Sequence, residues 1–218
     1  MTLHADLYFS FRSPYSYLAV GRYRVMSEEY DLEIKLRTVW PIAVRDPSIL
    51  FKGNPNIGRY ILLDAARNAQ MLGIPYRWPR PDPVVQDYET LEIAKEQPYI
   101  HRLCRLGQAA ENHGRGLAFA DEVSQVIWSG KVDDWHKGDH LAEASTRAGL
   151  EFSTLETEAV ENASALDAEI ASNQAKLEAA GHWGVPCLVF DGEPFFGQDR
   201  IEMAKWRMKQ SGLTHRGA

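Results

Sequence analysis

Cysteine is scarce in this chain, whose 218 residues include only Cys104 and Cys187. The two lie far apart and form no C-x-x-C motif, which excludes a dithiol redox enzyme and a disulfide-stapled scaffold as expected classes. Each has apolar neighbours, so buried packing is favoured over a reactive thiol. Any thiol chemistry would therefore need a thiol brought in by a ligand.

Long hydrophobic runs and an excess of positive charge are missing as well. No apolar stretch approaches the length of a membrane span, and residues 1–6 lead directly into a strand pattern without a signal-peptide pattern. The net charge of −6 offers no electrostatic basis for binding nucleic acid or an anionic membrane. We therefore expect a cytoplasmic protein with neither of these partners.

The first forty residues predict a β-α-β unit. Residues 3–11 are rich in strand-forming side chains, and residues 32–40 alternate between apolar and charged side chains. Between them Ser13 and Pro14 begin a helix expected to end near Glu28, because serine is a favourable N-cap and proline suits the first helical turn. The two strands are expected to pair in parallel.

The other end of the chain predicts a β-β-α unit. Residues 187–190 form a short apolar strand, Asp191-Gly192 is a typical two-residue hairpin turn, and residues 193–196 return, with Pro194 favouring an edge position. Residues 198–200 then open a helix. Pro186 precedes the first of these strands, and a cis bond there would turn the backbone of Val185 towards an extended ligand.

The stretch between the two units is predicted to be mainly helical. It follows a long loop over residues 41–55 and is interrupted by an extended, proline-rich segment at 74–83. The whole order describes an α/β protein of thioredoxin-like fold (β-α-β … β-β-α) with a large inserted α-helical region. We expect residues 1–57 and 182–218 to form the thioredoxin-like domain and residues 58–181 the inserted helical domain.

Ser13 is the first candidate for chemistry, because the start of a helix after a strand favours a bound anion. A serine cannot exchange disulfides, but its hydroxyl can donate a hydrogen bond to a thiolate of a ligand. Such charge-assisted bonds contribute roughly 1.5–3 kcal/mol and would lower the pKa of a bound thiol by about one to two units. The alternative is that Ser13 only caps the helix.

Three further candidates each have two interpretations. Asp199, at the predicted helix start, could cap that helix or receive a ligand ammonium. Trp183 could line a pocket for an aromatic substrate, although aromatic side chains are more often part of a core. His136 and His140 have the spacing of a metal-binding pair on a helix, but Gly138 interrupts it and no third ligand follows. We expect no metal site.

Two motifs, one near each end, resemble those of the 2-hydroxychromene-2-carboxylate isomerase family. They are Phe11-Arg12-Ser13-Pro14-Tyr15-Ser16-Tyr17-Leu18-Ala19 and Gly184-Val185-Pro186 with Phe195-Phe196-Gly197-Gln198-Asp199-Arg200. That family is related to kappa-class glutathione transferases and, more distantly, to DsbA-type oxidoreductases. The likeness extends over the whole chain, including the helical insertion. Arg12 departs from it, since an apolar residue is usual there, and this leaves the substrate open.

The resemblance implies a glutathione site. Ser13 corresponds to the catalytic serine that holds the glutathione sulfur, and the backbone of Val185 to the group that pairs with the cysteinyl unit. Gln198 and Asp199 correspond to the pair at the γ-glutamyl end, and Arg59 to a cation for the glycyl carboxylate. The implied cofactor-binding residues are Val185, Pro186, Gln198, Asp199, Arg59 and Asn54.

The reaction that the resemblance implies is a glutathione-dependent isomerisation of the 2-hydroxychromene-2-carboxylate / trans-o-hydroxybenzylidenepyruvate type. Reversible addition of the thiolate to the conjugated pyruvate turns a double bond into a single bond that can rotate. The resemblance thus implies glutathione and a small aromatic substrate as ligands, and a homodimer. A kappa-like glutathione transferase and a non-catalytic member of the thioredoxin superfamily remain the alternatives.

Overall fold

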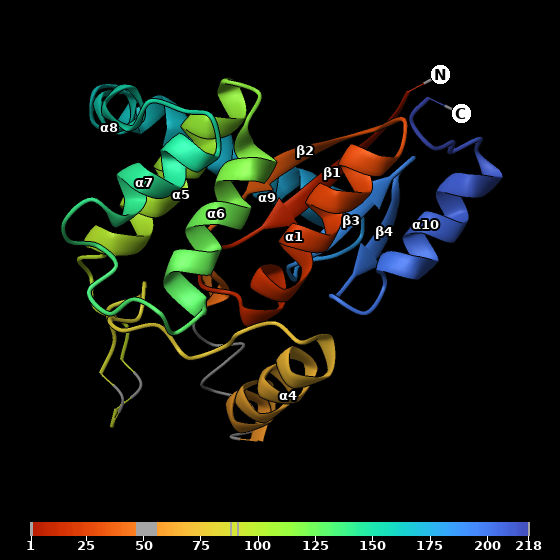
Figure 1. Cartoon of the computed structure of the whole chain (residues 1–218). Coiled ribbons are helices and arrows are strands. Elements are labelled where there is room, and N and C mark those ends of the chain that lie inside the picture. Colours follow the sequence, from red (N-terminus) through yellow and green to blue (C-terminus); the bar gives the residue numbers. More distant parts are fainter. Residues whose placement is uncertain (1, 47–55, 88, 91, 218) are drawn as a thin grey trace.

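The computed structural model describes residues 2–46, 56–87, 89–90 and 92–217. In them a four-stranded sheet has the order β2-β1-β3-β4. Its strands are β1 (Leu3–Phe9), β2 (Leu32–Thr38), β3 (Cys187–Phe190) and β4 (Glu193–Phe196). The pair β1 and β2 is parallel, whereas β3 runs antiparallel to both β1 and β4. The predicted β-α-β and β-β-α units are therefore confirmed, and the two ends of the chain build one sheet (Figure 1).

Helices cover both faces of this sheet. On one face α1 (Pro14–Glu29) and α10 (Ile201–Gln210) bury their apolar side chains in the main core, together with Leu7, Leu188 and Phe195 of the strands. On the other face Leu177 of α9 (Ala163–Ala179) packs with Tyr8 and Cys187. Successive strand residues thus alternate between two cores, as a sheet covered on both sides requires.

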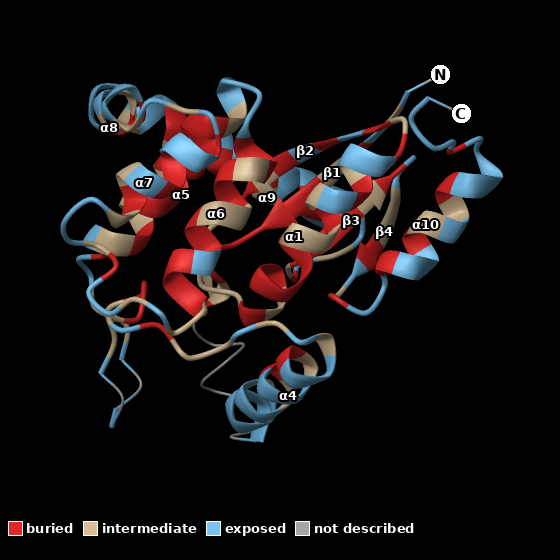
Figure 2. Ribbon diagram, in the orientation of Figure 1, coloured by how far each residue is buried: buried red, intermediate tan, exposed pale blue. Residues whose placement is uncertain are grey.

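The remaining helices of the described residues lie between β2 and β3 in the sequence. They are α2 (Ile42–Arg45), α4 (Asn56–Leu72), α5 (Pro98–Asn112), α6 (Gly116–Trp128), α7 (His140–Arg147) and α8 (Phe152–Glu161). The main core continues through α5 and α6, which are largely buried in Figure 2. None of the helices in the described residues is long and apolar enough to cross a membrane.

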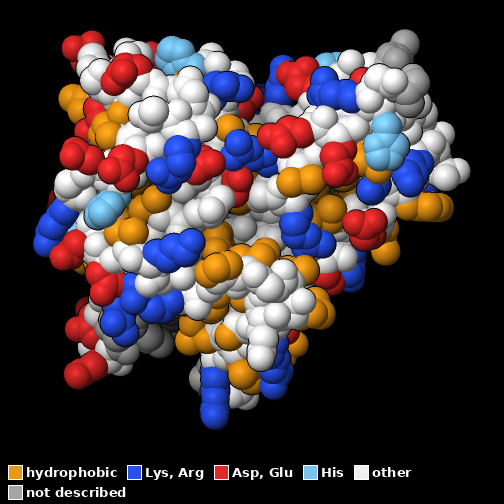
Figure 3. Space-filling view, viewed as in Figure 1, with side chains coloured by type: hydrophobic (Ala, Val, Ile, Leu, Met, Phe, Trp, Pro, Cys, Tyr) orange, Lys and Arg blue, Asp and Glu red, His pale blue; other side chains and the backbone are white. Residues whose placement is uncertain are grey.

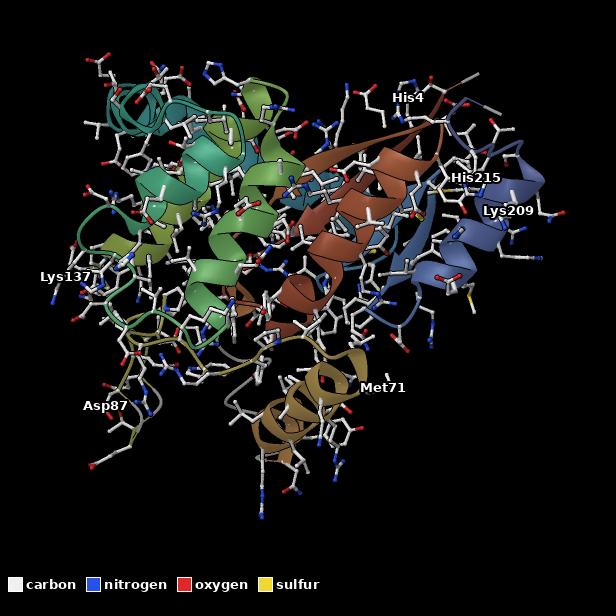
Figure 4. The ribbon with its side chains drawn as sticks, viewed as in Figure 1. His4, Met71, Asp87, Lys137, Lys209 and His215 are labelled. Atoms are coloured by element: carbon white, nitrogen blue, oxygen red, sulfur yellow. The ribbon has the colours of Figure 1, made fainter. Side chains whose placement is uncertain are left out.

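Helix α4 is much less buried than α5 and α6. It buries only Ala65 and Ala69, and it lies below the rest of the molecule in Figure 1. Hydrophobic side chains gather over it on the face shown in Figure 3, and Met71 at its end is 75% exposed (Figure 4). The sequence predicted a helical stretch from residue 58 onwards, in agreement with α4, but it did not predict how little of this helix would be covered.

The C-terminal hairpin follows its sequence closely. Asp191 and Gly192 have positive φ angles of 50° and 78°, as a tight hairpin turn of this kind requires. Pro194 lies in β4, at the edge of the sheet, as predicted. Of the two interpretations of Asp199, the structure excludes one: α10 begins at Ile201, and no side chain caps it. Asp199 is therefore not its N-cap.

Glu111 of α5 reaches the other edge of the sheet. Its Oε2 accepts a hydrogen bond from the backbone amide of Leu36 in β2, at 3.1 Å. Burial raises the pKa of the Glu111 carboxyl from 4.5 to about 7, because desolvation outweighs that hydrogen bond. The carboxylate form therefore costs folding free energy at neutral and higher pH.

We expect Glu111→Gln to stabilise the protein at about pH 8 and to change little at about pH 4. Below the unfolded-state pKa both states are protonated, whereas above the folded-state pKa the wild-type protein buries a charge that the amide lacks. The gain should be about 2 kcal/mol, given 1.36 kcal/mol per pKa unit and partial exposure. Urea unfolding at both pH values measures it, and a gain of equal size at both would contradict the assigned pKa.

Candidate functional site

Ser13 joins the two ends of the chain. It is the N-cap of α1, where its Oγ accepts a hydrogen bond from the amide of Ser16 at 3.1 Å. The same hydroxyl donates to the carbonyl oxygen of Val185 at 3.3 Å, across 172 positions of sequence. The predicted cap is therefore confirmed, and Ser13 lies directly beside a second residue of the expected site.

Val185 and Pro186 are joined by a cis peptide bond. The carbonyl oxygen of Pro186 accepts a hydrogen bond from the amide of Gly197 at 2.8 Å, which places the β4–α10 loop beside this bond. Gln198 and Asp199 follow Gly197 in that loop. The fold thus gathers the start of α1, the bond before β3 and the loop before α10 into one region.

Gln198 is buried, and both ends of its side-chain amide are engaged. Its Oε1 accepts a hydrogen bond from Arg22 of α1 at 2.9 Å, and its Nε2 donates to Asn68 of α4 at 2.7 Å. The side chain therefore fixes the loop against two helices. A direct contact of Gln198 with a ligand stays a prediction, and it would require one of these bonds to be exchanged.

The network around Gln198 continues along α4. Asn68 also donates to the carboxylate of Asp64 at 3.0 Å, and this carboxylate accepts a hydrogen bond from the hydroxyl of Tyr15 at 2.8 Å. Tyr15 and Arg22 lie on the same helix as the Ser13 cap. Our sequence analysis missed Arg22, Asp64 and Asn68. The only sequence feature that could have indicated them is the spacing of Asp64 and Asn68, which lie at positions i and i+4 of a helix and can therefore contact each other.

Among the described residues, no hydrogen bond or ion pair joins Asp199 or Arg59, which are also expected to contact the ligand, to Ser13 or Val185. Asp199 is exposed, and its carboxylate pairs with the neighbouring Arg200 at 2.5 Å. Arg59 is exposed in the first turns of α4, and no contact in the described chain connects it with Ser13 or Val185. Asn54 lies outside the described residues. The roles of these three residues stay predictions.

Arg12, directly before Ser13, forms a buried ion pair. Its guanidinium donates two hydrogen bonds to Asp82, from Nε at 3.0 Å and from Nη2 at 2.9 Å. Only 11% of the Arg12 side chain and 5% of the Asp82 side chain are exposed. The guanidinium also lies over the ring of Trp78, with Cζ 5.3 Å from the ring centroid. This pair attaches the segment between α4 and α5 to the Ser13 turn.

An aromatic stack lies next to Val185. The ring of His182 is 4.1 Å from that of Phe196 and 5.6 Å from that of Trp183, and both pairs are nearly parallel. Burial lowers the pKa of His182, and its Nδ1 accepts a hydrogen bond from the amide of Gly184 at 2.9 Å. Trp183 is 50% exposed, and Arg45 of α2 donates a hydrogen bond to its carbonyl oxygen. An exposed aromatic surface thus borders the site.

The two thiols of the chain are buried. Burial raises the pKa of Cys187 to about 12, although this residue directly follows Pro186, and it raises the pKa of Cys104 further still. Neither side chain is exposed, which confirms both as core residues. At neutral pH the site therefore has a hydroxyl donor and a helix N-terminus, but no thiolate of its own.

A separate groove lies away from the Ser13 turn. Between α1 and the helices α6 and α7 is a hollow of about 900 Å³, lined by both acidic and basic side chains such as Asp121, Lys131 and Arg147. Neither Ser13 nor Val185 lines it. Since its charges are of both signs and several are already paired, the groove favours no particular class of ligand, and volume alone does not make it the site.

Known structures of the same fold include both isomerase and redox proteins. The chain resembles a 2-hydroxychromene-2-carboxylate isomerase structure with a TM-score of 0.69, 23% identity and 96% of each chain covered. It also resembles a probable DsbA oxidoreductase from Streptomyces coelicolor, with a TM-score of 0.65, 16% identity and coverage of 96% of this chain and 89% of that one. A cytosolic disulfide reductase from Pseudomonas aeruginosa, DsbM with GSH, gives a TM-score of 0.57, 15% identity and coverage of 96% and 100%.

A family model assigns the chain more directly. No curated protein matches the sequence significantly. The model described as a DSBA-like thioredoxin domain, however, matches residues 5–209. This range spans both halves of the sheet and the helices inserted between them, as the predicted thioredoxin-like class requires. The chain belongs to the DSBA-like thioredoxin domain family.

Proposed function

We propose that the protein is a glutathione-dependent isomerase of the trans-o-hydroxybenzylidenepyruvate type. The observation that carries the proposal is the hydrogen bond from Ser13 Oγ to the carbonyl oxygen of Val185. It places a hydroxyl donor and the N-terminus of α1, where a thioredoxin enzyme would have a reactive cysteine, beside the backbone of the cis Val185–Pro186 bond. These groups suit a peptide ligand that brings its own thiolate.

Glutathione fits the residues present. The backbone of Val185 can pair with the cysteinyl unit of an extended tripeptide, as an added strand does. The loop that carries Gln198 and Asp199 lies beside Pro186, so it can hold the γ-glutamyl end. Arg59 and Asn54 are proposed for the glycyl end. One distantly similar protein supports the ligand class, namely the cytosolic disulfide reductase whose structure includes GSH.

In this reaction Ser13 would turn its hydroxyl from the Val185 carbonyl to the ligand sulfur. Donation to a negative sulfur, with the positive end of the α1 dipole behind it, keeps the thiol deprotonated near neutral pH. Bound glutathione would supply the thiolate that adds to, and later leaves, the conjugated carbon of the substrate. The exposed rings of Trp183 and Phe196 are proposed to contact the aromatic part of the substrate.

A glutathione transferase would use the same groups at Ser13 and Val185 and would differ in releasing the conjugate. Product analysis distinguishes the two, because an isomerase returns free glutathione. A disulfide reductase is disfavoured, since Ser13 occupies the position of the reactive thiol and Cys187 is buried. The homodimer, the cytoplasmic location and the division at residues 57 and 182 stay predictions.

The first test is calorimetric titration of the protein with glutathione. We expect binding, and we expect Asp199→Ala to weaken it about tenfold, equivalent to about 1.4 kcal/mol, because Asp199 would hold the ligand ammonium. Asp139→Ala is the matched control, since it removes the same charge from an exposed site in the helical insertion.

Either of two results would count against this assignment. Equal binding by the Asp199 variant and the wild-type protein would remove Asp199 from the site. A wild-type protein that fails to bind glutathione at millimolar concentration would contradict the proposed function as a whole, and the non-catalytic alternative would then be favoured.

A further inference from the structure

The side chain of Arg12, at the edge of the candidate site, is held in one orientation by Asp82 and Trp78. Its partner Asp82 lies in the segment between α4 and α5, which passes beneath α1 and α6 in Figure 1. The carboxylate of Asp82 is held independently of Arg12. Its Oδ1 accepts from the amide of Val84 at 2.8 Å, and its Oδ2 from Nε1 of Trp78 at 3.2 Å. These two bonds fix the Asp82 carboxylate in place, and the carboxylate in turn fixes the Arg12 guanidinium.

The ion pair uses only part of the guanidinium. Nε and Nη2 donate to Asp82, whereas Nη1 has no hydrogen-bond partner among the described residues. The side chain keeps 11% of its surface exposed, so it is not fully enclosed. One face lies over the Trp78 ring, which stabilises the cation and orients its plane. Arg12 therefore has N–H groups available in a fixed direction.

The position of these groups matters because Arg12 is bonded directly to Ser13. A substrate that reacts with a thiolate held by Ser13 must bring its electron-poor carbon close to this turn. An arginine whose free N–H groups are preoriented suits a planar carboxylate, since guanidinium and carboxylate match in shape and charge. An apolar residue at this position would provide no such recognition.

We infer that Arg12 is a specificity-determining residue that binds the carboxylate of the second substrate. The inference rests on the proposed function and deepens it, because it names the side chain that recognises the substrate's carboxylate and so selects an anion over a neutral electrophile. Asp82 and Trp78 act as positioning residues for Arg12.

The test compares trans-o-hydroxybenzylidenepyruvate with its methyl ester, which lacks the charge. The variant is Arg12→Gln with Asp82→Asn, a double replacement that leaves no unpaired buried charge and is checked for folding by circular dichroism. For the anion we expect kcat/KM to fall roughly 10- to 100-fold, as the loss of a charge-assisted hydrogen bond predicts. For the ester, kcat/KM of the double variant should stay within about threefold of the wild-type value. Arg12→Lys, which keeps the charge, should be intermediate.

An equal loss for anion and ester would overturn the inference, because Arg12 would then serve structure alone. If the wild-type protein isomerises neither compound, the proposed function fails while the role of Arg12 remains testable. Quenching of tryptophan fluorescence then measures binding of the anion and the ester without glutathione. Tighter binding of the anion by the wild-type protein only would support the inference, and equal binding of both compounds would overturn it.

Discussion

Replacement of Ser13 by alanine should lower glutathione-dependent turnover about 100-fold or more. Among the described residues, the Ser13 hydroxyl is the side-chain donor that lies between the α1 N-terminus and Val185. Removal of a single donor to a developing or resident negative charge typically costs on the order of 100- to 1000-fold in rate. Glutathione affinity should fall much less, because the backbone and the β4–α10 loop would still hold the peptide.

The thiolate is the direct readout of this prediction. Ultraviolet difference spectra of the glutathione complex should show a thiolate band in the wild-type protein, and its pKa should rise by about one to two units in Ser13→Ala. Ser13→Thr keeps both the hydroxyl and the cap and should retain most activity. Turnover of the alanine variant at the wild-type rate would refute the role of Ser13, and only its capping function would remain.

Removal of Asp82 should have the largest effect on stability. Asp82→Ala leaves the Arg12 guanidinium buried without a counter-charge, and it deprives Trp78 and the amide of Val84 of their acceptor. Breaking a buried pair in this way costs about 3–5 kcal/mol. The midpoint of urea unfolding should fall accordingly. Adding Arg12→Met to the Asp82→Ala variant should recover part of the lost stability, because it replaces the unpaired guanidinium with an apolar side chain.

Arg105 and Asp167 provide the matched control for this prediction. They form the same two-fold hydrogen-bonded pair, at 2.7 and 2.6 Å, but their side chains are 26% and 36% exposed. Asp167→Ala should therefore cost no more than about 1 kcal/mol. If Asp82→Ala and Asp167→Ala lowered the free energy of unfolding by the same small amount, the burial of the Arg12–Asp82 pair would not contribute the stability assigned to it.

The local rules of the sequence predicted those parts of the fold that depend on neighbours in the chain. Ser13 before Pro14 predicted the start of α1, and Asp191-Gly192 predicted the hairpin turn, because each rests on backbone geometry within a few residues. Alternation over residues 32–40 predicted β2, which ends slightly earlier, at Thr38. The first strand ends earlier than predicted, at Phe9, because the amide of Ser13 bonds to the carbonyl of Ser10 and closes a turn.

Contacts between segments far apart in the chain could not be predicted from the sequence. Nothing near Arg12 indicates that Asp82 lies opposite, seventy positions away. Nothing near Gln198 indicates that Arg22 and Asn68 occupy both ends of its amide. The candidate site was anticipated through its similarity to a family, whereas the polar groups that hold it in place depend on how the helical insertion packs, and no local pattern specifies that packing.

The strand order has a consequence for synthesis of the chain. Strand β1 has β2 on one side and β3 on the other, yet β3 lies near the C-terminus (Figure 1). While the intervening residues are made on the ribosome, one edge of β1 stays unpaired, and such an edge can pair with another nascent chain. The segment that carries β3, which is synthesised after the helical insertion, both closes this edge of β1 and brings Val185 to Ser13, so protection from aggregation and completion of the site are achieved in the same step.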